Sequence, residues 1–332
     1  MRKTCILMIL GMLVFIPGTQ LVSPGPGTFR QGSRTSSLLF YNVENLFHPS
    51  DDDSPGDDAF TPGGLRHWTY GRYRRKVTAV ARVIHAAGGW DPPHLVGLAE
   101  VENRHVLEDL VRHPVLLPYD YGIAHAESPD HRGIDVALLY RRPQVQILQQ
   151  LPLEVRVPGR EGGTRDILRA TLAVREDTLE VFLNHWISKY GGVLETEPGR
   201  IYQARLLRDS IEAVCSRFPG RLVLAAGDFN DVAESRSMIR LTEGGRVRLW
   251  PVAPDRGSYK YRGRWQSIDH VLVAGDTAGL RGTLTVVEFP FLLERDEKYG
   301  GQKPFRSYAG YRFNGGTSDH LPLLFRFTLP KR

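Results

Sequence analysis

Polar side chains follow several apolar runs of this sequence, each close to the point where the run begins or ends. They are Asn42 and Glu44 in FYNVEN, Glu100 in GLAEVEN, Asn184 and His185 in FLNHW, Asp228 and Asn230 in LAAGDFN, Asp269 and His270 in SIDHVL, and Asp319 and His320 in SDHLP. Carboxylates gathered on one rim of a sheet repel one another, so they need a cation or protons beside them. Oxygen-rich ligands with few histidines suit Mg²⁺ or Mn²⁺ better than zinc, and the chain has no CxxC or HExxH motif.

Such a set suits hydrolysis of a phosphate ester. A hard metal polarises a phosphoryl oxygen, a carboxylate orients or deprotonates water, and a protonated histidine stabilises the developing charge. Each residue alone also fits a structural role: Asn42 suits a turn, Glu100 the start of a helix, and GDFN an Asx turn. His185 alone suits a half-buried, hydrogen-bonded histidine, and we expect His270, inside an apolar strand, to be structural. The recurrence of polar residues at strand ends favours one shared site.

Buried strands are needed to carry these residues, and the sequence predicts them. Apolar, β-rich runs cover residues 37–47, 93–100, 133–141, 167–174, 179–186, 221–230, 267–275 and 318–329. Helical periodicity covers residues 73–88, 103–114 and 200–218, and the last of these places Cys215 in the core. No linker-like segment divides the chain after residue 36. We therefore expect one α/β domain whose sheets pack together between helices.

The composition is that of a globular protein, with 332 residues, 41% of them hydrophobic and 24% charged. Arg2 and Lys3 precede the apolar run CILMILGMLVFIPG, which is short for a membrane span and predicts a cleaved signal peptide over residues 1–26. Residues 27–36 read as a linker and 37–330 as the domain, located in the periplasm or outside the cell. The formal net charge of +6 would fall to +4 on cleavage and suits an anionic partner.

A series of motifs in a fixed order makes the chain resemble the endonuclease/exonuclease/phosphatase superfamily, which includes DNase I, apurinic endonucleases, inositol-polyphosphate 5-phosphatases and neutral sphingomyelinases. FYNVENLF resembles its first Asn-bearing strand, and GLAEVEN its metal-binding segment, with Ala99 where Gln is common. NHW, GDFN, SIDHVL and SDHLP follow in the family's order, and the NVENLF opening is most similar to secreted bacterial members. The resemblance implies a DNase I-like four-layer α/β sandwich, with two mixed β-sheets face to face between helices.

The resemblance also implies roles for individual residues. Metal ligation falls to Glu100, with Asn42 beside it and Asp319 as a further carboxylate, and the cofactor is Mg²⁺ or Mn²⁺. Asp228 positions or deprotonates water, and Asn230 contacts phosphate. The remaining roles are His320 on the scissile phosphate, Asp269 as the partner that fixes its tautomer, and His185 near the leaving group.

Substrate contacts are less determined by the sequence. Lys189, Arg132 and Arg205 are candidates for binding the substrate, although each also suits a solvated surface. The segment from Phe289 to Phe313 is aromatic and basic and could form a wall of the site. We expect a monomeric, metal-dependent phosphodiesterase that cleaves DNA or RNA and does not insert in a membrane. The alternatives are a phosphatase or lipid phosphodiesterase with the same chemistry, and a non-catalytic binding protein.

Overall fold

The computed structural model describes residues 35–50, 58–252 and 257–328. The expected signal peptide and most of the expected linker lie outside these residues. The first strand, β1 (Thr35–Leu46), begins two residues inside the segment expected to be linker. In the described part of the chain, no helix combines the length and apolar character needed to cross a membrane.

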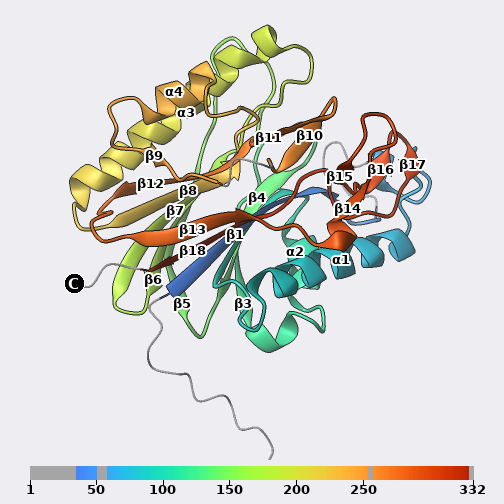
Figure 1. Ribbon diagram of the computed structural model, residues 1–332, viewed down its shortest axis with the longest axis horizontal. Coiled ribbons are helices and arrows are strands. Elements are labelled where there is room, and N and C mark those ends of the chain that lie inside the picture. Colours follow the sequence, from blue (N-terminus) through green and yellow to red (C-terminus); the bar gives the residue numbers. More distant parts are fainter. Residues whose placement is uncertain (1–34, 51–57, 253–256, 329–332) are drawn as a thin grey trace, which may run out of the picture. The chain divides into compact units, whose positions relative to one another are not determined.

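Two six-stranded mixed sheets form the centre of the fold (Figure 1). The first sheet has the order β13-β18-β1-β2-β4-β3, where β1 and β2 are parallel and the other neighbours antiparallel. Its further strands are β2 (Leu95–Val101), β3 (Tyr121–His125), β4 (Asp135–Arg141), β13 (Arg281–Val286) and β18 (Leu323–Thr328).

The second sheet has the order β5-β6-β7-β8-β12-β9, and its parallel pair is β7 with β8. Its strands are β5 (Val145–Leu153), β6 (Ile167–Val174), β7 (Asp177–His185), β8 (Leu222–Asp228), β9 (Arg248–Leu249) and β12 (Asp269–Gly275). Three two-stranded ribbons add β10 (Tyr259–Tyr261) with β11 (Arg264–Gln266), β14 (Leu293–Arg295) with β15 (Gln302–Pro304), and β16 (Tyr308–Ala309) with β17 (Arg312–Phe313).

Helices cover the outer face of each sheet, as their apolar periodicity predicts. They are α1 (Tyr70–Gly88) and α2 (Arg104–Val111) on the first sheet, and α3 (Val193–Arg217) and α4 (Arg236–Thr242) on the second. Single 3-10 turns span Asp58–Phe60, Leu117–Tyr119 and Pro290–Leu292. Thr69 caps the start of α1, where its side chain accepts from the Arg72 amide, and Gly89 ends it at a φ of 70°.

Three apolar clusters separate four layers. Leu39 and Tyr41 of β1 face α1, whereas Leu38 and Phe40 of the same strand face the second sheet. This strand is buried on both sides, which explains its continuous apolar run. The third cluster joins α3 to the second sheet and buries Cys215, as expected. The four-layer α/β sandwich expected from the sequence is confirmed.

Candidate active site

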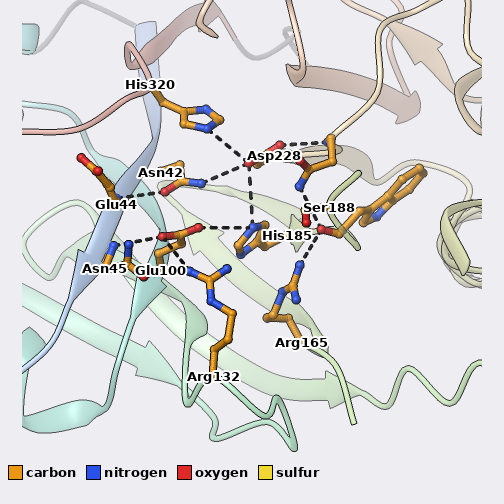
Figure 2. A network of polar contacts seen from close by, with 12 residues as sticks. Asn42, Glu44, Asn45, Glu100, Arg132, Arg165, His185, Ser188, Asp228 and His320 are labelled. Carbon is orange, nitrogen blue, oxygen red and sulfur yellow. Dashed lines mark hydrogen bonds and ion pairs between the residues drawn. The ribbon is translucent and has the colours of Figure 1, made fainter. Parts of the chain in front are cut away.

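The two parallel strand pairs bring the strand-end residues to one edge of the sandwich. In the second sheet, His185 of β7 lies in register with Asp228 of β8, which in turn lies in register with Asp269 of β12. In the first sheet, Asn42 of β1 lies beside Ala99 of β2, one residue before Glu100. Both sheets therefore present polar side chains at the same edge, where Figure 2 shows them converging.

The backbone at this edge departs from regular strand geometry. Glu44, Asn45, Glu100 and Asn230 have φ values of 53°, 58°, 63° and 52°, in the left-handed region that non-glycine residues seldom occupy. Bulges interrupt the pairing of β1 with β2 at the same place. At these residues the side chains no longer alternate between the two faces of the sheet. Such strained conformations persist only where surrounding contacts stabilise them, most often at functional sites.

His320 lies between two carboxylates. Its Nδ1 is 2.8 Å from Asp269 Oδ2, and its Nε2 is 3.6 Å from Asp228 Oδ2. Burial alone would lower the pKa of His320, but Asp269 and Asp228 outweigh it and hold the pKa well above its usual value. The imidazole is therefore a cation at neutral pH. Although Asp228, Asp269 and His320 bring ligand atoms close together, the bond from Nδ1 to Asp269 is typical of an oriented imidazolium.

Asp228 is the centre of the network in Figure 2. Its Oδ2 accepts from Asn42 Nδ2 at 3.1 Å, and its Oδ1 accepts from the Asn230 amide at 2.9 Å. Burial raises its pKa to about 7; the Asp269 charge adds to this, while His320 opposes it. His185 Nε2 lies 3.8 Å from Asp228 and 3.8 Å from Glu100. Burial, followed by the charge of Arg165, lowers the pKa of His185 well below its usual value, so this ring is neutral.

Glu100 is suited to hold a metal ion. Its Oε2 accepts from the Asn45 amide at 3.0 Å and lies 3.3 Å from the Arg132 guanidinium, while its Oε1 has His185 Nε2 at 3.8 Å, beyond hydrogen-bonding distance. Burial would raise the pKa of Glu100, but Arg132 and His320 lower it below the usual value. The group is thus an anion with one oxygen open to a cation.

Glu44 and Asp319 form a second group of carboxylates at the edge of the first sheet. Arg306 joins them, with its guanidinium 3.2 Å from Glu44 Oε1 and 3.0 Å from Asp319 Oδ2. Burial and the Asp319 charge raise the pKa of Glu44 to about 7. Beneath them, the buried Lys76 of α1 donates to the Glu44 carbonyl at 2.9 Å and to Thr317, two residues before Asp319.

The donor set fits a hard divalent cation. Glu44, Glu100 and Asp319 line one cleft together, and all three are oxygen donors. Burial is the main cause of the raised pKa of Glu44, and the charge of Asp319 adds to it against Lys76 and Arg306. Asn42, expected beside the metal, donates to Asp228 through Nδ2, and its Oδ1 accepts from the Glu44 amide at 3.0 Å. Its Nδ2 thus orients Asp228, and an amide oxygen that accepts one N–H keeps a second lone pair.

The cleft has a volume of about 1000 Å³ and includes most of the residues expected at the site. Lys189 lines it, but its ammonium pairs with Asp231 at 2.9 Å and is partly neutralised. Arg205 is not brought to the cleft: it is exposed on α3, whereas the neighbouring Gln203 and Ala204 face the core. The expectation that Arg205 contacts substrate is therefore not supported. Asp269 lies behind His320 and does not line the cleft.

Arg165 is a site residue that the sequence does not indicate. Its guanidinium bonds to Asp130 at 2.9 Å and to the Trp186 carbonyl at 2.6 Å, and Asn230 Nδ2 donates to the same carbonyl at 3.0 Å. The residue is buried, lines the cleft and adds positive charge next to His185. No motif marks it, because Asp130, Trp186 and Arg165 meet only through loop packing.

A histidine between carboxylates, in a cleft that three further carboxylates line at the edge of a two-sheet sandwich, is an arrangement suited to hydrolysis of phosphate esters. The model of the Endonuclease/Exonuclease/phosphatase family matches residues 37–328. The chain belongs to this family. No curated protein matches the chain in sequence.

Solved structures support the fold. A humanized D. rerio TDP2 with 14 mutations has a TM-score of 0.57 at 14% identity, covering 90% of this chain and 100% of that one. An endonuclease/exonuclease/phosphatase family protein from Bacteroides thetaiotaomicron has a TM-score of 0.57 at 14% identity, with 90% and 98% covered. The human Nocturnin catalytic domain with bound sulfate has a TM-score of 0.58 at 13% identity, with 90% and 95% covered.

Proposed function

We propose that this protein is a Mg²⁺- or Mn²⁺-dependent phosphodiesterase that cleaves nucleic acid, acts as a monomer and is exported like the secreted bacterial members of the family. The observation that carries the proposal is the pairing, across one cleft, of the Asp269–His320–Asp228 chain with the carboxylates Glu44, Glu100 and Asp319. Export is supported by the apolar run after Arg2 and Lys3.

Each residue then has a separate task. Glu100, with Glu44 and Asp319, would hold the metal ion, which would supply polarisation of a phosphoryl oxygen. His320, a cation, hydrogen-bonds the phosphate and stabilises its developing charge. Asp228 accepts the proton of the attacking water as the new P–O bond forms and the ester P–O bond breaks, and the leaving alkoxide takes a proton from solvent.

The size and lining of the cleft support an extended anionic substrate. At about 1000 Å³ the cleft is much larger than one phosphate group, and it is lined by Arg66, Arg132, Arg160, Arg165 and Lys189. Nucleic acid offers this combination of length and repeated charge. Hydrolysis of a small phosphomonoester does not need so large a cleft.

One observation favours a second candidate, a lipid phosphodiesterase. Tyr190, in the loop from β7 into α3, and Leu194, in the first turn of α3, are 93% and 78% exposed, and Tyr190 lines the cleft. Apolar side chains beside the site are what an enzyme that works at a lipid surface needs. They also suit stacking against bases, so the substrate assay must include both classes.

The test is hydrolysis of supercoiled plasmid, sphingomyelin vesicles and a panel of phosphomonoesters, each with Mg²⁺, Mn²⁺ or EDTA. His320→Ala serves as the inactive variant and Arg205→Ala, outside the cleft, as the matched control. Metal-dependent nicking of plasmid that only His320→Ala abolishes would support the nuclease. Hydrolysis of sphingomyelin alone would replace it with the lipid enzyme, release of phosphate from monoesters alone would make it a phosphatase, and silence on all three would favour a binding protein.

A further inference from the structure

A side pocket of about 130 Å³ adjoins the cleft next to the metal-side carboxylates. Its walls are lined by Glu44, Asn45, Phe60, Arg66, Trp68, Arg306, Ser307, Tyr308 and Gly310. Glu44, Asn45, Phe60, Arg66 and Arg306 also line the main cleft, so the two spaces share a wall. Neither Asp228 nor His320 lines the side pocket, so a group bound there is not the group under attack.

Arg66 is held in this pocket by aromatic rings. Its guanidinium carbon lies 4.8 Å from the ring centre of Phe60, 5.0 Å from that of Tyr308 and 5.7 Å from that of Tyr311. Its NH1 donates to the Gly310 carbonyl at 3.0 Å. The Arg66 carbonyl accepts from Tyr308 Oη at 2.9 Å and from Arg72 at 2.7 Å, which fixes the backbone as well. The guanidinium is thus preorganised.

The charge of Arg66 is not neutralised within the described residues. Arg306, the other arginine of the side pocket, pairs with Glu44 and Asp319, whereas no carboxylate in residues 35–50, 58–252 or 257–328 lies within ion-pair distance of Arg66. Apart from the bond to Gly310, the side-chain N–H groups of Arg66 make no hydrogen bond to these residues. A fixed guanidinium with unused donors on the wall of a cleft is suited to bind an anion.

We infer that Arg66 and its side pocket bind a second phosphate group of the substrate, next to the phosphate that is cleaved. The inference rests on the proposed phosphodiesterase function and narrows its substrate to molecules with at least two phosphates. A planar guanidinium matches phosphate through paired N–H groups, which a lysine cannot reproduce. The second phosphate belongs either to a neighbouring nucleotide or to a small bisphosphate, and the ring walls of Phe60, Trp68 and Tyr308 admit both.

The experiment compares ligands that differ by one phosphate. Binding is measured by calorimetry on the full chain in EDTA, so that nothing is hydrolysed. One arm uses a dinucleoside monophosphate and the same molecule with an added terminal phosphate at either end. The other arm uses a hexose monophosphate and the corresponding bisphosphate. The proteins are wild type, Arg66→Ala, Arg66→Lys and, as the matched control, Arg205→Ala.

We expect the second phosphate to tighten binding to wild type and Arg205→Ala about tenfold or more in one arm, and that arm identifies the source of the phosphate. In Arg66→Ala the gain should fall below about twofold, with Arg66→Lys in between. The affinities for the ligands with one and two phosphates are compared within each protein. A loss of stability in Arg66→Ala would weaken both and would leave their ratio unchanged.

An equal gain in wild type and Arg66→Ala would overturn the inference. So would the absence of any gain, or of any measurable binding, in wild type, because the subsite consists of the chain's own residues and needs no metal. The proposed function fails separately: a protein that hydrolyses no ester yet shows the Arg66-dependent gain would keep the phosphate subsite and lose the enzyme.

Discussion

Two histidines in one cleft lie in opposite electrostatic environments. His320 has Asp269 at 2.8 Å and Asp228 at 3.6 Å, so its pKa is well above the usual value. Burial lowers the pKa of His185, and the positive charges of Arg165 and Arg132 add to this, so its pKa is well below the usual value. One ring is therefore an imidazolium that can hold a phosphate, and the other is a neutral donor or acceptor.

The pH dependence of the reaction should report Asp228. As a base it must be ionised, and its pKa of about 7 lies above the ordinary aspartate value because of burial and the Asp269 charge. At saturating Mg²⁺, kcat/KM should therefore rise as the pH increases through about 7, while His320 remains protonated. We expect Asp228→Asn to lose about 10²–10⁴ of the rate and this rising limb. A profile of kcat/KM between pH 5 and 9 that falls through pH 7 would contradict the role of Asp228.

Asp269 should act through His320. Asp269→Asn removes the nearer of the two carboxylates that raise the pKa of His320, so this pKa should fall. We expect a rate loss of roughly 10–100-fold, the range seen when partners that orient a functional group are removed. The readout is the His320 titration followed by NMR, with His94, which bonds to Ser37 Oγ and whose pKa does not depend on Asp269, as an internal reference. An unchanged His320 pKa together with a full rate loss would point to misfolding instead.

At the scale of elements, the apolar periodicity of the sequence predicts the strands and helices that form the fold. It does not predict the loop contacts. The six polar motifs meet at one edge of the sandwich, because the parallel strands β1, β2, β7 and β8 end there and the antiparallel strands β12 and β18 begin there. Glu44 belongs to the same pattern, yet its part in the site depends on Arg306, 262 positions away. Arg165 and Arg66 act through loop contacts, which periodicity does not encode. Helical position explains why Arg205 faces solvent.

Lys76 is the point at which α1 holds the metal side of the site. Its buried ammonium donates to the Glu44 carbonyl, to Ser307 Oγ at 2.5 Å and to the Thr317 carbonyl. Lys76→Met removes all three bonds and leaves buried acceptors unpaired, so we expect a loss of about 3 kcal/mol in the free energy of unfolding. Arg74→Met, on the exposed face of α1, should change it by less than about 0.5 kcal/mol. Urea unfolding measures the free energy of unfolding of both variants. Similar losses in the two variants would show that the buried bonds of Lys76 do not stabilise the site.

At the scale of the whole domain, the site exists only while the two sheets stay in alignment. One sheet brings Asn42, Glu44 and Glu100, and the other His185 and Asp228. Gly97 of β2 lies at their contact, where an added Cβ would come within 2.6 Å of Leu183 and 3.1 Å of Phe40. We expect Gly97→Ala to cost about 1–3 kcal/mol and to lower kcat as the sheets separate. The free energy of unfolding and kcat of Gly97→Ala are measured on one preparation. An unchanged free energy of unfolding would show that the two sheets can move apart without loss of stability.

Metal binding should stabilise the folded domain, and more strongly at higher pH. The ion would bind the ionised carboxylates, and the pKa of about 7 at Glu44 means that this ligand is mostly protonated at pH 6 and mostly charged at pH 8. With Mg²⁺ at about 100 times its Kd, the gain is about 2.7 kcal/mol, or several degrees in Tm, because the ion binds only the folded chain.

Thermal unfolding with Mg²⁺ or EDTA at pH 6 and pH 8 measures this gain. Glu44→Gln should remove most of the difference between the two pH values, while Arg205→Ala should keep it. A Tm shift of the same size at both pH values in wild type would mean that Glu44 does not take part in binding. The metal ligands would then be Glu100 and Asp319. In the described residues, the Glu44 carboxylate would keep Arg306 as its ion-pair partner.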